Sequence, residues 1–276
     1  MARPTRRRRP LAGTRDFIAY RWPTYLFLYG GGALLALVGA FVATALDRQW
    51  LAVVALGAFA LLAYFFMTSL WAAYLLYDRR EYRADHLLFH HGRLQPTSRF
   101  VHIGLGRRET PARLSRRLTG GHVRVIDIYN PQLMPGSALA RSRRRHTAPD
   151  PRITWLDGTF DLLPLADKSV WTLTANRTLS QFQDHGDRVL LLEQLFRVLE
   201  PGGQLIVIEP VRTSFALLIW GPAALEEEPP LYWQSLFHDA GFLVREERMI
   251  HGLAMLFVLE KPLPGEIQQL RFNFGV

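Results

Sequence analysis

The first third of the chain holds two long stretches without any charged residue, 24–46 and 51–77, separated by a short polar turn at 47–50. Each stretch exceeds the roughly 20 residues that a helix needs to cross a hydrocarbon core of about 30 Å. A signal peptide fits poorly, because the first stretch is too long and the second follows almost at once. A buried hairpin of a soluble protein is the other alternative. We predict a transmembrane helical hairpin.

The segments that flank this hairpin are basic. The arm before it, residues 1–23, contains "RPTRRRRP", and "DRREYR" follows it at 78–83. Because basic flanks stay on the cytoplasmic side, we expect both termini and the chain after residue 77 in the cytoplasm, and the hairpin in a bacterial inner membrane. The aromatic residues that would mark the two interfaces are Tyr20, Trp22, Tyr25, Trp71, Tyr74 and Tyr77 on the cytoplasmic side and Trp50 on the far side.

A row of small residues runs along the first stretch at a spacing of four, made of Gly32, Ala36, Ala40 and Thr44. Such a row lets another helix approach closely. We expect it to contact either the second stretch or a helix of another protein.

From about residue 85 to 262 the pattern changes to short apolar runs that alternate with amphipathic ones, and a tail of residues 263–276 follows. The expected strands are 99–105, 122–129, 152–156, 169–175, 204–211, 242–250 and 254–261, and the clearest helices are 110–118 and 187–200. This alternation predicts an α/β domain with a mostly parallel sheet and helices on both faces. Ligands bind such sheets at the carboxyl ends of the strands.

Four segments in this domain carry a family resemblance: "VHIGLG" at 101–106, "VRVIDIYNPQLM" at 123–134, "ITWLDGTFDLLPLADKSVWTLT" at 153–174 and "LFRVLEPGGQLIVIEP" at 195–210. By their order and spacing, residues 86–262 resemble a class I S-adenosylmethionine (SAM)-dependent methyltransferase. The resemblance implies a Rossmann-like fold with a seven-stranded, mostly parallel sheet, and SAM as the cofactor.

The resemblance also implies where that cofactor would bind. Gly104 and Gly106 match the glycine loop, and Asp127 matches the acid that accepts hydrogen bonds from the ribose hydroxyls. Ile128 and Tyr129 follow it, where they could pack on the adenine. The last pair, Gly158 and Thr159, stands where the family has a glycine and an acid that reads the adenine amino group.

Four positions depart from the family pattern. His102 replaces the acid before the glycines, Arg108 replaces the third glycine, and Thr159 and Trp171 replace acids on the third and fourth strands. A long cationic side chain at position 108 would either swing out or fill the pocket, near a sulfonium of like charge. From these departures we expect weak or absent catalysis and doubtful SAM binding, and we assign no catalytic residue.

The charge of the chain indicates an anionic partner. The formal net charge is +9, and Lys168 and Lys261 are the only lysines. A GC-rich bacterial genome explains the high ratio of arginine to lysine, but it does not explain the positive net charge. Basic clusters at 113–117 and 141–145 suit anionic phospholipid headgroups or an acidic protein face better than nucleic acid, for which no recognition motif is present. The chain has no cysteine, and the pair His86 and His90 lacks a third ligand, so we expect no metal.

Two hypotheses remain open at this point. The first is a membrane-anchored, methyltransferase-like accessory or scaffolding subunit of a bacterial inner-membrane complex, respiratory or photosynthetic. The second is an active SAM-dependent methyltransferase acting on a membrane-resident small molecule, such as a quinone, a tetrapyrrole or a lipid precursor. The direction of the Arg108 side chain and the space beside it would separate the two.

Overall fold

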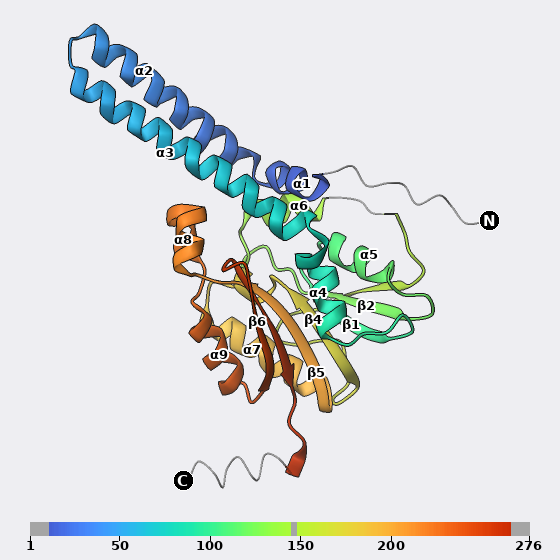
Figure 1. Ribbon diagram of the computed structural model, residues 1–276. Helices are drawn as coiled ribbons and strands as arrows, with labels where there is room; N and C mark the ends of the chain where they lie inside the picture. Colours follow the sequence, from blue (N-terminus) through green and yellow to red (C-terminus); the bar gives the residue numbers. More distant parts are fainter. Residues whose placement is uncertain (1–10, 145–147, 266–276) are drawn as a thin grey trace, which may run out of the picture. The chain divides into compact units, whose positions relative to one another are not determined.

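The computed structural model of the chain describes residues 11–144 and 148–265 (Figure 1). Residues 1–10 of the predicted N-terminal arm, 266–276 of the predicted C-terminal tail and Arg145 of the second basic cluster therefore lie outside the described residues. The chain divides into two compact units, one made of residues 1–83 with 218–221 and the other of residues 84–217 with 222–276.

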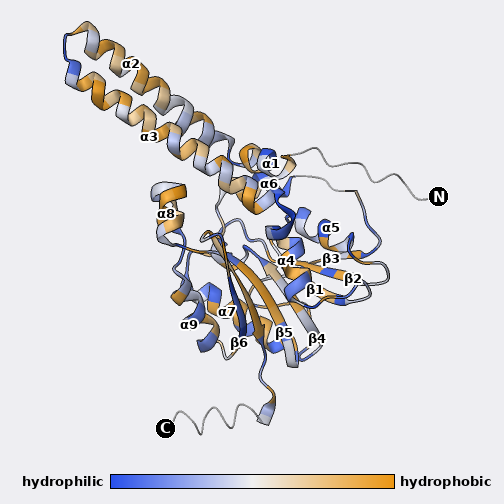
Figure 2. Ribbon diagram, viewed as in Figure 1, coloured by the Kyte–Doolittle hydropathy of each residue, from blue (hydrophilic) through white to orange (hydrophobic). Residues whose placement is uncertain are grey.

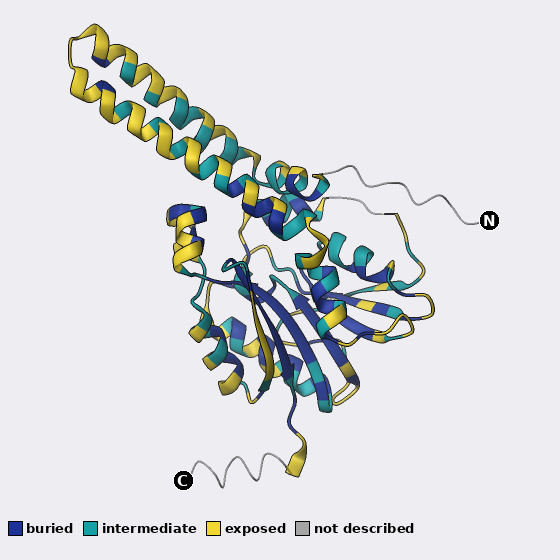
Figure 3. Cartoon of the chain, viewed as in Figure 1, coloured by how far each residue is buried: buried dark blue, intermediate teal, exposed yellow. Residues whose placement is uncertain are grey.

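Two long helical segments dominate the first unit: Thr24–Ala45 and Gln49–Asp78. Its elements are α1 Ala12–Tyr20, the π-helical η1 Thr24–Gly31, α2 Gly32–Ala45, α3 Gln49–Ala73, the π-helical η2 Tyr74–Asp78 and the 3-10 turn η3 Arg80–Tyr82. Both segments are long and apolar enough to cross a membrane, and only 6% of the best apolar window of each is buried (Figures 2 and 3). That exposure differs from the burial of a core hairpin in a soluble protein, while membrane crossing stays a prediction.

Small residues let the two segments pack closely. A Cβ added at Gly32 would lie 3.0 Å from Leu62 Cδ1, and one at Gly39 would lie 3.9 Å from the Ala55 Cβ. The small-residue face of the first segment is thus used within the hairpin, the first of the two expected contacts. Beyond it, Asp78 accepts hydrogen bonds from the amides that open α1, at 2.7 and 2.8 Å, and so satisfies donors that a helix leaves unpaired.

The second unit is a seven-stranded sheet with helices between its strands. Its elements are α4 Ala84–His91, β1 Arg99–Gly104, α5 Glu109–Ser115, β2 His122–Asp127, α6 Ser137–Arg143, β3 Ile153–Asp157, β4 Val170–Asn176, η4 Leu179–Gln181, α7 His185–Val198, β5 Leu199–Pro210, α8 Ser214–Trp220, η5 Gly221–Glu226, α9 Pro230–Asp239, β6 Leu243–Ile250 and β7 Ala254–Glu260. Of these, α8 and η5 contribute Leu218–Gly221 to the first unit.

The strand order of the described sheet is β3-β2-β1-β4-β5-β7-β6, and β7 runs antiparallel to the other six strands. The predicted seven-stranded, mostly parallel sheet is confirmed. The chain returns to the middle of the sheet between β1 and β4, which makes their carboxyl ends the point where a crevice can form.

Apolar strands and the leucines of α7 build the core. Leu191, Leu192 and Leu195 are at most 1% exposed and pack with β4 and β5. Each such side chain contributes about 1.5–3 kcal/mol on burial. The turn at Pro201–Gly203 needs its glycine, because Gly202 has a φ of 76°. This core fixes the carboxyl ends of β1 and β2 in place.

Candidate cofactor site

The glycine loop and Asp127 meet at the carboxyl edge of the sheet. In the register of β1 and β2, Gly104 pairs with Asp127. In the next pair of strands, Asp127 lies beside Asp157. The sheet therefore brings together the predicted loop and the predicted ribose acceptor, as their spacing in the sequence requires.

Gly106 shapes the space next to that carboxylate. Its φ is 71°, and a Cβ added there would lie 2.6 Å from Asp127 Oδ2. Only a residue without a side chain leaves this space open in the left-handed conformation. The loop is thus a cradle that faces the Asp127 carboxylate.

A third group, Arg143 at the end of α6, fills the cradle. Its Nη1 donates hydrogen bonds to both Asp127 carboxylate oxygens, each at 2.8 Å. Its guanidinium carbon lies 4.1 Å from the centre of the Tyr129 ring, and it occupies the position that a Cβ on Gly106 would take. Arg143 therefore binds the carboxylate and the ring that the family resemblance predicts for the ribose and the adenine.

The two loop glycines should respond differently to alanine. A Cβ at Gly104 would make ordinary contacts of 3.5 Å or more with His102, whereas one at Gly106 would meet Asp127 and Arg143 in a left-handed backbone. We expect Gly106→Ala to lower the free energy of unfolding by about 1–2 kcal/mol. Gly104→Ala should change it far less. Thermal denaturation of the two purified variants checks this, and equal losses would contradict it.

Arg108, the residue expected to swing out or to fill the pocket, does the former. Its side chain is exposed, and its guanidinium lies 5.1 Å from the centre of the Trp155 ring on β3. The third family glycine is therefore replaced without an obstruction by residue 108. The side chain that fills the cradle is instead that of Arg143 on α6, which lies outside the glycine motif.

The other predicted site residues lie around this cradle with different exposures. Ile128 is 1% exposed and belongs to the core. Gly158 packs tightly, since a Cβ there would lie 2.8 Å from Ile126 and 2.9 Å from Pro164. Thr159 is exposed, and its hydroxyl donates to the Leu162 carbonyl at 3.2 Å. Their roles in cofactor binding stay predictions.

His102 is a buried member of the sheet. It is 3% exposed, and its Nδ1 lies 2.9 Å from the Thr174 hydroxyl of the neighbouring strand. Burial lowers the pKa of His102 to about 4, so the imidazole is neutral at physiological pH. The residue that replaces the family acid is thus held by β4.

This burial predicts a pH dependence of stability. The pKa of a histidine in the unfolded chain is near 6.5, above the value in the folded protein. His102 should therefore not lower the free energy of unfolding above pH 6.5, and should lower it as the pH falls below 6.5. Between pH 7 and pH 5.5 the loss should be about 1 kcal/mol. Comparing the denaturation of the wild type with that of His102→Asn isolates this slope. Parallel curves for the two proteins would contradict it.

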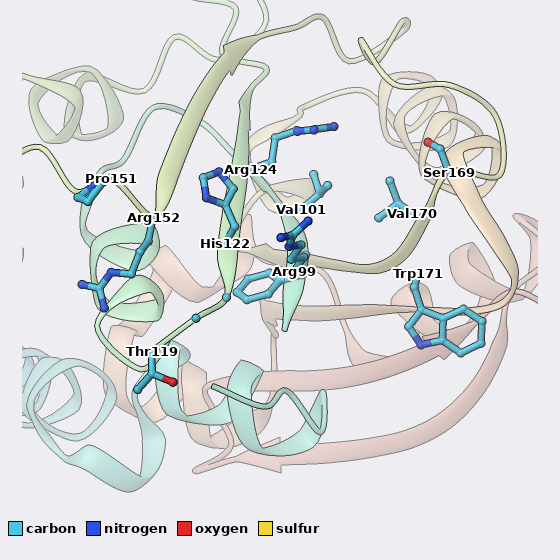
Figure 4. Close-up of a pocket in the computed structure, with 13 residues that line it drawn as sticks. Arg99, Val101, Thr119, His122, Arg124, Pro151, Arg152, Ser169, Val170 and Trp171 are labelled. Atoms are coloured by element: carbon cyan, nitrogen blue, oxygen red, sulfur yellow. The ribbon is translucent and has the colours of Figure 1, made fainter. Parts of the chain in front are cut away.

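Trp171 lies at the amino end of β4, away from the cradle. It lines a cavity of about 650 Å³ at the amino ends of the strands, together with Arg99 and Arg124 (Figure 4). Because nucleotide sites in parallel sheets lie at the carboxyl edge, this departure from the family pattern lies outside the candidate cofactor site.

Sequence reasoning missed Glu209, which orders the loop after β4. This carboxylate is fully buried and accepts hydrogen bonds from the backbone amides of Thr178 and Leu179 at 2.8 Å and of Ser180 at 3.2 Å. Burial raises the pKa of Glu209. The loop that it holds follows the end of β4, next to the glycine loop on β1. Only its place at the end of an apolar strand could have pointed to it.

The residues present fit the nucleoside part of SAM. Gly106 leaves space for it, Asp127 offers a carboxylate to its ribose hydroxyls, and Tyr129 offers an aromatic face. The fit requires that the Arg143 side chain leave the cradle. That side chain is 29% exposed, which gives it a path to water.

Comparisons with known proteins agree with this geometry. Residues 101–207 match the family model described as a methyltransferase domain. The chain is 27% identical over 191 residues to a demethylmenaquinone methyltransferase of Thermus thermophilus, covering 59% of this chain and 83% of that protein. It is 31% identical over 114 residues to the ubiquinone/menaquinone biosynthesis C-methyltransferase UbiE of Dinoroseobacter shibae, covering 40% of this chain and 42% of that protein.

Among solved structures, a SAM-dependent methyltransferase from Aquifex aeolicus superimposes with a TM-score of 0.51 and 16% identity, over 71% of this chain and 96% of that one. Residues 101–207 thus match a methyltransferase domain, and the superposition agrees with the Rossmann-like fold that the sequence resemblance implies. The family match implies that the domain binds SAM.

Proposed function

We propose that this protein is an active, membrane-anchored SAM-dependent methyltransferase whose substrate is a membrane-resident quinone precursor. The observation that carries the proposal is that Asp127 pairs with Gly104 at the carboxyl edge of the sheet and faces the turn at Gly106. The names of the relatives in Thermus and Dinoroseobacter support the substrate class, and the two long apolar segments support the anchor. The relatives favour the second of the two hypotheses drawn from the sequence.

The side chains of the site act by positioning. When bound, SAM supplies a methyl group on a sulfonium. Asp127 would hold the ribose hydroxyls, Tyr129 would cover the adenine, and the loop held by Glu209 would close the side next to β4. Holding two reactants in line can account for most of the acceleration of such a transfer. An anchored domain would in addition stay close to a substrate dissolved in the bilayer.

The test uses the full chain in lipid nanodiscs, SAM labelled in its methyl group and a membrane extract that contains unmethylated quinone precursors. We expect label in a lipid-soluble product whose mass has increased by one CH₂. Asp127→Ala should abolish that product. If SAM binds but no lipid-soluble product forms, the proposed substrate class is wrong.

The Arg143–Asp127 pair favours a second candidate function. In it the site is permanently closed, and the chain is an accessory subunit of an inner-membrane complex that uses its arginine clusters to contact acidic proteins or anionic lipid headgroups. This candidate predicts that SAM fails to bind the wild-type chain, in which Arg143 stays on Asp127. It also predicts that an integral membrane protein copurifies with the chain.

A further inference from the structure

A second apolar stretch lies outside the hairpin, at residues 215–225. These eleven residues contain no charged side chain, and they are helical as α8 and η5. Four of their large apolar side chains are exposed: Phe215 and Leu217 at 38%, Leu218 at 56% and Leu225 at 58%. Figure 2 shows the strongly apolar character of α8 and Figure 3 its exposure. Single exposed leucines are ordinary, but four in eleven residues form a patch.

Part of this stretch, Leu218–Gly221, belongs to the first unit. There the Tyr64 hydroxyl donates to the Leu218 carbonyl at 3.1 Å, and the Thr68 hydroxyl donates to the Ile219 carbonyl at 2.9 Å. The last carbonyls of a helix normally have no partner within the helix. In hydrocarbon they need one, because water is absent. Two hydroxyls of α3 provide it here.

The positions of these hydroxyls along α3 give a depth. Trp71 marks the predicted cytoplasmic interface, and Thr68 and Tyr64 precede it by three and seven residues. At 1.5 Å per residue they lie about 5 and 10 Å inside that interface. Helices that lie in the plane of a membrane insert to about the same depth, roughly 5–10 Å.

The stretch also begins at the edge of the sheet where the cofactor site lies. It starts five residues after Pro210, at the carboxyl end of β5, and β5 is parallel to the strands that carry the glycine loop and Asp127. A segment inserted in lipid at this edge would present the methyltransferase domain directly to molecules dissolved in the bilayer.

We propose that residues 215–225 insert into the acyl region of the cytoplasmic leaflet and anchor the carboxyl edge of the methyltransferase domain at the bilayer. The occupant of the apolar patch is then lipid hydrocarbon. The inference rests on the proposed membrane anchoring, and it adds the route by which an apolar substrate reaches the domain. Arg212 before the stretch and Glu226 after it mark where the chain returns to water.

The absence of native cysteine permits a direct test. Nitroxide labels on Leu217→Cys and Leu225→Cys, in the full chain in phosphatidylglycerol-containing nanodiscs, report collisions with lipid-soluble oxygen and with a water-soluble nickel chelate. We expect oxygen to dominate at both positions. Leu162→Cys is the matched control, because this leucine is 67% exposed in the second unit and should meet the nickel chelate. Leu56→Cys on α3 reports on the anchor itself.

The collision data at positions 56, 217 and 225 can contradict the proposal in three ways. If Leu217→Cys and Leu225→Cys respond like Leu162→Cys while Leu56→Cys responds to oxygen, the anchor stands and the inserted stretch is wrong. Protection from both reagents at 217 and 225 would place protein around the stretch and would also overturn it. If Leu56→Cys meets the nickel chelate, both the anchor and the insertion fall. Methyl transfer, measured separately, is not decided by these labels.

Discussion

Replacing Asp127 with alanine should weaken SAM binding by at least about a hundredfold, equivalent to about 2.7 kcal/mol. The carboxylate faces the Gly106 cradle, where a Cβ added at Gly106 would lie 2.6 Å from Asp127 Oδ2. Its loss would leave two ribose hydroxyls without their charged acceptor. Isothermal titration of SAM into the detergent-purified chain measures the effect.

Asp157 provides the matched control for this experiment. It ends the neighbouring strand in register with Asp127, but its side chain is exposed. Asp157→Ala should keep SAM affinity within about threefold of the wild type, as expected for a surface position. If both substitutions weaken SAM binding equally, the claim that Asp127 holds the ribose hydroxyls is wrong.

Replacing Arg143 with alanine should have the opposite effect and tighten SAM binding by about thirtyfold, or about 2 kcal/mol. In the wild type the cofactor must first displace a guanidinium that makes two hydrogen bonds to Asp127 and lies over Tyr129. That cost is absent from Arg143→Ala. Because the pair is partly exposed, high salt should also tighten wild-type binding but not binding to the variant.

The control for Arg143→Ala is Arg144→Ala, which removes an exposed arginine from the next position. Its SAM affinity should equal that of the wild type, since a general loss of positive charge is the only change. Weaker binding by Arg143→Ala would mean that the guanidinium holds the cofactor, and the competition described above would be wrong.

The fold was predictable because the buried strands are continuous apolar runs separated by glycine and proline turns. The pairing of Gly104 with Asp127 was predictable for the same reason, as two parallel strands that end at one edge bring their last residues together. The structure also agrees with the expected seven strands, and the helices 110–118 and 187–200 shifted only at their ends, to Glu109–Ser115 and His185–Val198.

The occupant of the cradle was not predictable. Arg143 lies in an arginine run at 141–145, which the sequence presents only as positive charge. Its contact with Asp127 depends on the path of the chain between β2 and α6. The pattern of apolar and polar residues in the sequence does not predict that path. The place of His102 in the family motif suggested a part in cofactor binding. The register of β1 and β4 instead pairs it with Thr174, whose hydroxyl lies 2.9 Å from its Nδ1.

The central claim is that this domain binds SAM at Asp127, and a titration of SAM into the detergent-purified wild type and Arg143→Ala tests it most directly. We predict saturable binding to both proteins, tighter in the variant, and the loss of binding in Asp127→Ala. If neither protein binds SAM at millimolar concentration while both remain folded, the account is contradicted. The domain would then be a scaffold with the fold of a methyltransferase.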